Sequence, residues 1–371
     1  MGLLKNIFGK KEITVDSYES FWNWFLLHEK VFSKVVRDKF NLKKESTDIE
    51  SAFFDKLAPK LANIKDGIWY LAGIVKDNIV ELTLTVDGAP ENIVFVEELI
   101  AAAPSIDGWQ FTALKPAIDF KDFGISMRGF EFNNTNQNFY SKENIDYPDE
   151  IEIVVVHDDW TEESKDAISN GVFIYIDNYI GELDFVNNID NLEIIGRQQA
   201  EKDLIPIGKL KDFLTWRQKE FVEKYEGTRY DTANDKYSVL EAKLESGNML
   251  IAVINTELLN WDSKASHPWV CAFTIKYDGS KSNGMPAKAD CQVMDNIEED
   301  MMNELKDYDG YLNVGRETAD SERTIYFACK DFRKPSKVFF NIQKKYKERF
   351  EMGYTIYKDK YWKSLERFNP K

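Results

Sequence analysis

Apolar and amphipathic runs alternate most regularly in the last third of the chain, from residue 267 to residue 358. Residues 269–277 form a β-branched and aromatic run that ends at Asp278 and Gly279, which predicts a largely buried strand followed by a turn. In residues 287–305 apolar side chains recur every three or four positions, and this spacing predicts an amphipathic helix. Strands at 311–316, 324–329 and 354–357, with a second helix that begins near Pro335, complete a βαββαβ order.

The two predicted helices of this region carry opposite charges on their outer faces, the first acidic and the second basic. A βαββαβ order with right-handed crossovers places both helices on one face of a four-stranded antiparallel sheet. One interpretation is that the helices are neighbours whose exposed charges partly compensate, each pair contributing about 0–1 kcal/mol. The alternative is that the second helix binds an acidic partner through Lys337, Lys344 and Lys345. In that case we expect a salt-sensitive interaction that is lost when the charges of Lys344 and Lys345 are reversed.

Three short segments of the same region resemble a known family: NGMP at residues 283–286, ERTIYFACKD at 322–331 and YKDKYW at 357–362. On these residues the chain from about 237 to 368 is identified as a member of domain-of-unknown-function family 695. That family is similar to the regulator-of-ribonuclease-E-activity B family. The resemblance implies a ferredoxin-like fold and a role in binding and regulating other proteins, and it supplies no catalytic residues.

The fold class expected for the whole chain is α+β with two domains. Residues 1–14 are predicted to be a flexible N-terminus, and residues 15–200 an acidic α+β domain that begins with two helices. A connecting helix and a linker are expected over residues 201–235. Residues 236–371 are then the ferredoxin-like domain, with an added hairpin at its N-terminal end.

The strands of the first domain are predicted from their apolar runs. A hairpin at 68–75 and 79–86, a helix at 90–103 and a strand at 109–114 give a ββαβ order. We expect residues 125–132 to extend this sheet. Further strands are predicted at 151–156, 172–176 and 192–195, the first two joined by a short helix from Thr161.

The net charge of −16 is unevenly distributed along the chain. Residues 230–371 contain 22 of the 48 basic and 23 of the 64 acidic side chains, a net charge of −1. Residues 1–229 therefore hold 26 basic and 41 acidic side chains, a net charge of −15. Such a surface repels nucleic acid and anionic membranes at long range, so we expect no direct binding to nucleic acid. It favours a basic partner protein, or competition with the nucleic acid that such a partner binds.

The cysteines indicate a reducing compartment. Cys271, Cys291 and Cys329 lie far apart in apolar runs, without the CxxC spacing of a zinc site or the even count of a disulfide framework. We therefore expect free core cysteines and a cytoplasmic location. No apolar run approaches the roughly 20 residues of a membrane-spanning helix, and no signal peptide is expected.

No motif in the sequence identifies a reaction. The three histidines lie in distant segments, and HExxH, GxSxG and phosphate-binding loops do not occur, so neither a metal nor a cofactor is predicted. His157, Asp158 and Asp159 follow a predicted strand, where active groups often lie, but we favour their role as residues that start a helix. Asp307 and Asp309 form a DxDG fragment, which we interpret as a plain turn.

The nine tryptophans are a second candidate for binding, because Trp is enriched in binding hot spots. Trp22 and Trp24 are two positions apart in a predicted helix and cannot share a face. One of them should be exposed or lie beneath another element. We favour a contact between domains, and binding of an external partner through Trp22 and Trp24 is the alternative.

These observations favour a soluble, non-catalytic protein-binding or regulatory protein. A first alternative is an enzyme or small-molecule binder whose site lies in the interdomain cleft, recognisable as a deep pocket lined by convergent polar groups. A second alternative is an immunity-type inhibitor of a toxin, which fits the acidic charge equally well.

Overall fold

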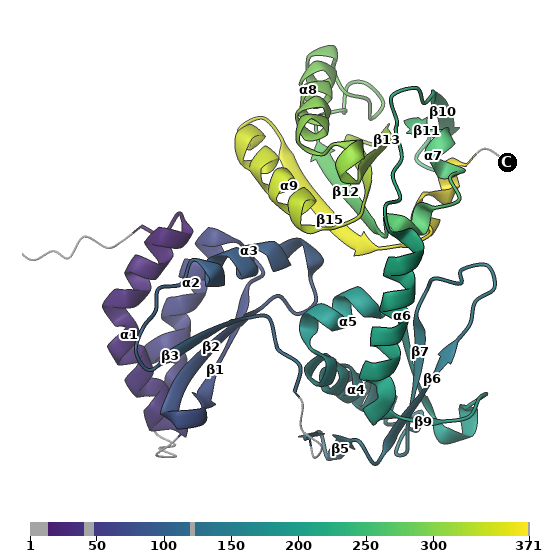
Figure 1. Ribbon diagram of the computed structural model, residues 1–371. Helices are drawn as coiled ribbons and strands as arrows, with labels where there is room; N and C mark the ends of the chain where they lie inside the picture. Colours follow the sequence, from purple (N-terminus) through teal and green to yellow (C-terminus); the bar gives the residue numbers. More distant parts are fainter. Residues whose placement is uncertain (1–13, 41–47, 119–122, 370–371) are drawn as a thin grey trace, which may run out of the picture. The chain divides into compact units, whose positions relative to one another are not determined.

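The computed structural model describes residues 14–40, 48–118 and 123–369 (Figure 1). Its helices and sheets confirm the α+β class. The chain divides into two compact units, residues 1–116 and 117–371, a division that falls inside the predicted 15–200 domain. Residues 1–13 of the predicted flexible N-terminus lie outside the described residues. Within the three described ranges, no helix has the length and apolar character that a membrane crossing needs.

Unit 1 has the predicted two leading helices and ββαβ order. Its elements are α1 (Tyr18–Phe40), the π-helical turn η1 (Glu50–Phe54), α2 (Asp55–Ile64), β1 (Trp69–Val75), β2 (Ile79–Thr85), α3 (Pro90–Ala101) and β3 (Trp109–Ala113). β1 pairs with β2 antiparallel, and β2 pairs with β3 parallel because α3 carries the chain across the sheet. Successive side chains of a strand point to opposite faces of the sheet. Trp69 and Leu71 of β1 are exposed on one face, while Leu82 and Leu84 of β2 point to the other face and are fully buried.

The first part of unit 2 contains a small hairpin and a four-stranded sheet. The hairpin strands are β4 (Gly124–Met127) and β5 (Phe130–Asn133), and the sheet order is β8-β7-β6-β9. After the hairpin, the elements of this part in chain order are β6 (Gln137–Lys142), β7 (Glu152–His157), α4 (Lys165–Ile180), α5 (Glu182–Asn188), β8 (Asn191–Gly196), β9 (Ile205–Pro206) and α6 (Leu210–Tyr225). The predicted strands at 151–156 and 192–195 are confirmed, and α6 is the connecting helix expected within residues 201–235.

Three predictions for this part are wrong. Residues 172–176 are not a strand but lie inside α4, whose buried side chains Ile168, Val172, Tyr175, Ile176 and Ile180 recur at helical spacing. This helix begins at Lys165 and not at Thr161. Residues 125–132 do not extend the first sheet, because Arg128 and Gly129 adopt positive φ values of 51° and 84° and fold the run back on itself.

The C-terminal part of unit 2 has the predicted ferredoxin-like topology. β12 (Trp269–Lys276), α8 (Lys288–Glu304), β13 (Tyr311–Ala319), β14 (Glu322–Cys329), α9 (Arg333–Tyr346) and β15 (Glu351–Lys358) follow in βαββαβ order. The sheet order is β10-β11-β13-β14-β12-β15, and every neighbouring pair is antiparallel. The added hairpin, β10 (Tyr237–Lys243) and β11 (Met249–Asn255), lengthens the sheet by two strands beyond β13.

The helices α8 and α9 lie side by side on one face of this sheet, called here the front face (Figure 1). Their apolar sides bury Met294, Ile297 and Met301 of α8 and Val338, Phe339 and Ile342 of α9. Lys345 Nζ lies 2.6 Å from Asp300 Oδ2 across the helix pair, and Arg349 pairs with Asp290. The interpretation of neighbouring helices with compensating charges is therefore confirmed.

The opposite face of the sheet is covered by two short helical segments, one that follows β11 and one near the C-terminus. The short helices α7 (Thr256–Leu259) and η7 (Lys363–Phe368) pack there, with Trp261 and Trp362, against Val270, Leu312 and Ala328. The central strands are therefore buried on both faces, which explains why residues 269–277 read as a continuous apolar run.

Candidate functional site

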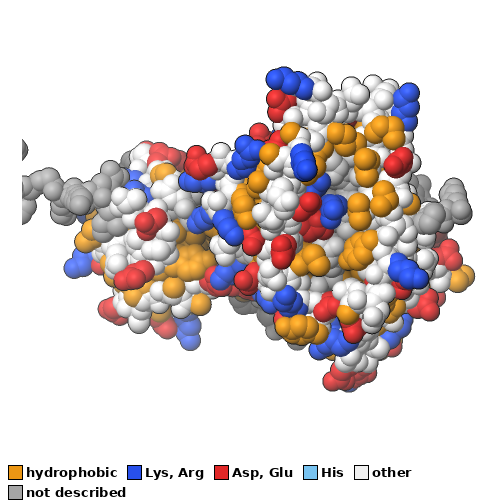
Figure 2. Space-filling model, turned by 90° about the horizontal axis from the view of Figure 1, so that it is seen from above, with side chains coloured by type: hydrophobic (Ala, Val, Ile, Leu, Met, Phe, Trp, Pro, Cys, Tyr) orange, Lys and Arg blue, Asp and Glu red, His pale blue; other side chains and the backbone are white. Residues whose placement is uncertain are grey.

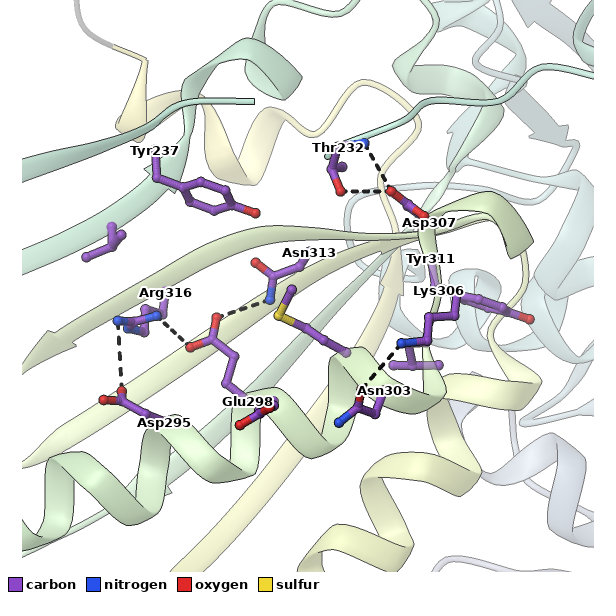
Figure 3. Close-up of a pocket in the computed structure, with 14 residues that line it drawn as sticks. Thr232, Tyr237, Asp295, Glu298, Asn303, Lys306, Asp307, Tyr311, Asn313 and Arg316 are labelled. Carbon is purple, nitrogen blue, oxygen red and sulfur yellow. Dashed lines mark hydrogen bonds and ion pairs between the residues drawn. The ribbon is translucent and has the colours of Figure 1, made fainter. Parts of the chain in front are cut away.

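A groove lies where the sheet continues past its helix layer, between α8 and the β10–β11 hairpin (Figure 3). We call it the β10–α8 groove. It has a volume of about 610 Å³, and fourteen residues line it: Thr232, Tyr237, Val253, Asp295, Glu298, Glu299, Met302, Asn303, Leu305, Lys306, Asp307, Tyr311, Asn313 and Arg316. Figure 2 looks down on this end of the molecule and shows hydrophobic side chains interspersed with acidic and basic ones.

The floor of the groove comes from the front face of three strands. Val253 of β11 is paired in register with Arg316 of β13 and with Val239 of β10, so these side chains point to the same face. Tyr237 belongs to the same alternating set on β10. Val239 is 65% exposed and Tyr237 is 41% exposed. The floor therefore presents large apolar side chains to solvent at the edge of the sheet.

The wall of the groove is one side of α8. Glu298, Glu299 and Met302 come three, four and seven positions after Asp295, which places the four on one side of the helix. This is part of the acidic outer face that the sequence predicts for the helix. Met302 is 42% exposed, so the wall combines carboxylates with one large apolar side chain.

A buried ion pair joins the wall to the floor (Figure 3). Glu298 is 6% exposed, and its carboxylate accepts hydrogen bonds from Arg316 Nη1 at 2.7 Å and from Asn313 Nδ2 at 3.1 Å. Asp295 lies 3.9 Å from Arg316 and accepts a hydrogen bond of 2.8 Å from Arg323. A carboxylate this far out of water is costly unless it is paired, so Glu298 fixes the position of Arg316.

The end of the groove is closed by the segment before β10. Asp307 Oδ2 accepts hydrogen bonds from the backbone N–H of Thr232 at 3.0 Å and from its hydroxyl at 2.8 Å. Burial would raise the pKa of Asp307, but these hydrogen bonds hold it below its usual value. Residues 307–309 form a 3₁₀ turn that ends at Gly310 with a φ of 95°, so the plain-turn interpretation of the DxDG fragment is confirmed.

The groove combines a phenol, carboxylates and exposed apolar side chains. Burial raises the pKa of Tyr237, with Glu298 acting in the same direction, so its hydroxyl stays protonated at neutral pH. Within the described ranges, no three His, Cys, Asp or Glu side chains gather closely enough to hold a metal ion. Exposed apolar side chains beside carboxylates suit a peptide with both apolar and basic groups.

The predicted partner-binding lysines lie on α9, away from the groove. Lys345 is engaged by Asp300, and the Lys344 ammonium lies 4.3 Å from the centroid of the Phe340 ring. Lys337 is half-buried. The structure does not bring these three residues together with the groove residues, and their role in binding an acidic partner stays a prediction.

The two predicted tryptophans are both buried in unit 1. Trp22 is 3% exposed, donates a hydrogen bond of 2.7 Å to the carbonyl oxygen of Leu99 and packs on Phe111. Trp24 is 4% exposed and packs against Phe32, and the ammonium of Lys60 on α2 lies over its ring. Each indole therefore lies beneath another element of the same unit.

The His157 triplet forms a turn and not the start of a helix. His157 is fully buried, and its ring nitrogens bond to the carbonyl oxygen of Glu131 and the backbone N–H of Asp159. Burial lowers the pKa of this imidazole, so it stays neutral. Asp158 pairs with Arg197 at 2.8 Å. The side chains of His157 and Asp158 are therefore accounted for by local structure.

Comparison with known proteins assigns the region that carries the groove. Residues 237–368 match DUF695, a family of unknown function. The DUF695 region runs from β10 through η7 and contains every groove residue except Thr232. The predicted resemblance to family 695 is confirmed for this region, and the similarity to the regulator-of-ribonuclease-E-activity B family stays a prediction. No curated protein and no solved structure matches the chain.

Sequence reasoning missed the groove itself. It predicted the added hairpin and the acidic face of α8, but it did not place one beside the other. The missing step was the pairing of β11 with β13, which follows from a long-range register between Val253 and Arg316. An acidic helix face together with two surplus strands was the available signal.

Proposed function

We propose that this chain is a regulatory protein that acts by binding another protein, and that the β10–α8 groove receives an amphipathic helix with Lys and Arg side chains along one side. The observation that carries the proposal is the sheet that extends past its helices. The ferredoxin-like core places two helices over four strands, and the added strands leave Val239 65% exposed on the same face. A helix from another chain would cover that face as α8 covers its neighbour.

The apolar side chains around the groove support an amphipathic partner. Tyr237, Val239 and Met302 are all large and at least 41% exposed. Tyr237 and Met302 line the groove from the strand side and the helix side, and Val239 is two positions after Tyr237 on the same strand face. Burying a side chain of this kind contributes about 1.5–3 kcal/mol. Three such side chains form a compact anchor region of the type found at the centre of interfaces.

The charges of the groove support a basic partner. Asp295, Glu298, Glu299 and Asp307 line it, against Lys306 and Arg316, so acidic groups are in excess. Glu298 is neutralised by Arg316, while Glu299 is exposed on the wall. Lys or Arg side chains of a bound helix would meet Glu299 at the rim, where charge sets orientation and association rate.

Two features of the sequence support the proposed regulatory role and a cytoplasmic location. The resemblance of the DUF695 region to regulators of ribonuclease E activity favours action by protein contact. The cysteines Cys271, Cys291 and Cys329 are free thiols, which favours a cytoplasmic location.

The test is site-specific photo-cross-linking with the full chain. A photoreactive amino acid replaces Val239, on the same sheet face beside the groove, and a matched chain carries it at Lys347, an exposed position in the turn that follows α9. After irradiation in cells of the source organism, we expect a discrete cross-linked protein from position 239 and none from position 347. Mass spectrometry should place the cross-link in an amphipathic helix rich in Lys and Arg.

A variant of the chain distinguishes a specific contact from non-specific binding. Glu299→Lys reverses the exposed charge of the wall without touching the buried ion pair, and it should weaken the cross-link from position 239 several-fold. The proposal fails if position 239 yields no discrete product, if both positions yield the same product, or if the cross-linked segment is acidic or extended.

A further inference from the structure

A second pocket lies within unit 2, where α5 and α6 meet the DUF695 region. It has a volume of about 480 Å³, within the usual range for small-molecule sites. Four basic side chains line it: Lys330, Arg333, Lys358 and Lys360. They come from the end of β14, the start of α9 and the end of β15, so the fold brings three chain segments to one place.

Two of these lysines share a single carboxylate. Lys358 Nζ and Lys360 Nζ each lie 2.8 Å from a different oxygen of Asp190. Their side chains are only 11% and 2% exposed, and that of Asp190 is 8% exposed. Two cations against one anion leave a positive charge that water does not solvate, which is unfavourable without a further anion.

The other two basic groups add to this imbalance. The Lys330 ammonium donates to the carbonyl oxygen of Thr228, a neutral acceptor. Arg333 is paired with Asp331 at 2.9 Å. The remaining acidic residues of the lining, Asp184 and Glu226, are exposed, so water screens them. Net positive charge is therefore buried beside Asp190, while the carboxylates of Asp184 and Glu226 lie on the exposed side of the pocket.

We infer that this pocket binds a small oxyanion ligand, whose phosphoryl or carboxylate group accepts hydrogen bonds from Lys330 and Lys358. The ammonium group of Lys358 bonds to Asp190 and to the carbonyl oxygen of Asn187, which uses two of its three N–H groups. Trp269 and Phe221 also line the pocket and provide apolar surface for the rest of the ligand. The site shares no residue with the β10–α8 groove and is independent of the proposed function.

The experiment is isothermal titration calorimetry of the full chain at pH 7 and constant ionic strength. Inorganic phosphate and tricarballylate are the two probes, and chloride is the reference anion. We expect saturable binding of at least one probe. Binding of phosphate alone identifies a phosphoryl ligand, binding of tricarballylate alone identifies a carboxylate ligand, and mutual competition shows one shared site.

Variants assign the binding to this pocket. Lys330→Gln removes one charge and should raise Kd about tenfold, because a charge-assisted hydrogen bond is lost. Lys334→Gln is the matched control: it lies four residues away, is 40% exposed and does not line the pocket, so it should leave Kd unchanged.

A measurement on the unaltered chain keeps the test valid if a variant fails to fold. A bound anion stabilises the folded chain by RT ln(1 + c/Kd), where c is the free probe concentration, so the midpoint of thermal unfolding should rise with the logarithm of the probe concentration, and more than with chloride at equal ionic strength. The inference is overturned if neither probe binds saturably, or if Lys330→Gln and Lys334→Gln bind the probe equally well.

Discussion

Glu298 of α8 and Arg316 of β13 form an ion pair at 2.7 Å that fastens the first helix of the ferredoxin-like core to the strand at its border with the added hairpin. Asn313 donates a second hydrogen bond to the same carboxylate, so the interaction fixes both strand residues. The wall and the floor of the β10–α8 groove are held at a set distance by this contact. The shape of the groove is thus built into the folded chain before any partner arrives.

Replacing Glu298 by Ala should lower the free energy of unfolding of unit 2 by about 2–4 kcal/mol. The reason is that Arg316 and Asn313 lose their acceptor in a place that water reaches poorly. Urea unfolding followed by circular dichroism measures the change. Glu304→Ala, at an exposed position of the same helix, is the control and should stay within about 0.5 kcal/mol of the unaltered chain. A loss from Glu298→Ala no larger than the control's would show that the pair is not stabilising.

The sequence predicts the DUF695 region well because each of its elements has a strong local pattern. The continuous apolar run of β12, which is buried on both faces, and the apolar stripe of α8 are visible in the sequence itself. Residues 172–176 misled the prediction because VFIYI is β-branched and aromatic over a short window, while its helical period appears only when Ile168 and Ile180 are included. The sequence could not predict the β10–α8 groove or the second pocket, because each brings together residues that are far apart in the chain.

The contact between α4 and the β4–β5 hairpin provides a second stability test. A Cβ atom added at Gly171 would lie 1.9 Å from Cζ of Phe132, which is fully buried. Gly171→Ala should therefore destabilise unit 2 by about 1–3 kcal/mol, even though Ala favours helix more than Gly does. Gly353→Ala is the control, since a Cβ there meets nothing within 4 Å. Equal midpoints of thermal unfolding for the two variants would contradict the packing seen here.

Acid should weaken the contact between the DUF695 region and the rest of unit 2. Burial would raise the pKa of Asp149, but hydrogen bonds of 2.7, 2.6 and 2.7 Å from Lys224, Tyr361 and Tyr225 hold it below its usual value. A carboxyl with a lowered pKa in the folded state stabilises the fold above about pH 4, and this stabilisation is lost as the pH falls through the folded pKa.

Asp149→Asn should accordingly cost about 2–3 kcal/mol at pH 7, and the difference from the unaltered chain should shrink as the pH falls below about 4. Denaturant unfolding at several pH values measures it. Asp212→Asn is the control, because that side chain is 78% exposed. A cost for Asp149→Asn that does not change with pH would mean that the Asp149 carboxylate does not titrate with folding.

Anion binding in the second pocket should weaken in alkaline solution. Burial lowers the pKa of Lys358 to about 8, although Asp190 and Glu150 act in the opposite direction, and Lys360 adds to the lowering. The positive charge of Lys358 is therefore present at pH 7 and largely lost at pH 9.5. Sulfate is a suitable probe because it stays doubly charged over this range. We expect its Kd to rise about tenfold between the two pH values, the effect of one lost charge-assisted hydrogen bond.

The variant Lys358→Met separates this titration from other effects of pH. With no ammonium group at position 358, sulfate should bind more weakly at pH 7, and its Kd should rise less up to pH 9.5 than in the unaltered chain. Some pH dependence should remain, because burial and Arg229 also lower the pKa of Lys330. Lys334→Gln should keep the full pH dependence, because Lys334 lies outside the pocket. Circular dichroism at both pH values checks that the chains remain folded. A sulfate Kd that is flat in the unaltered chain, or equally steep in Lys358→Met, would show that another group controls the binding.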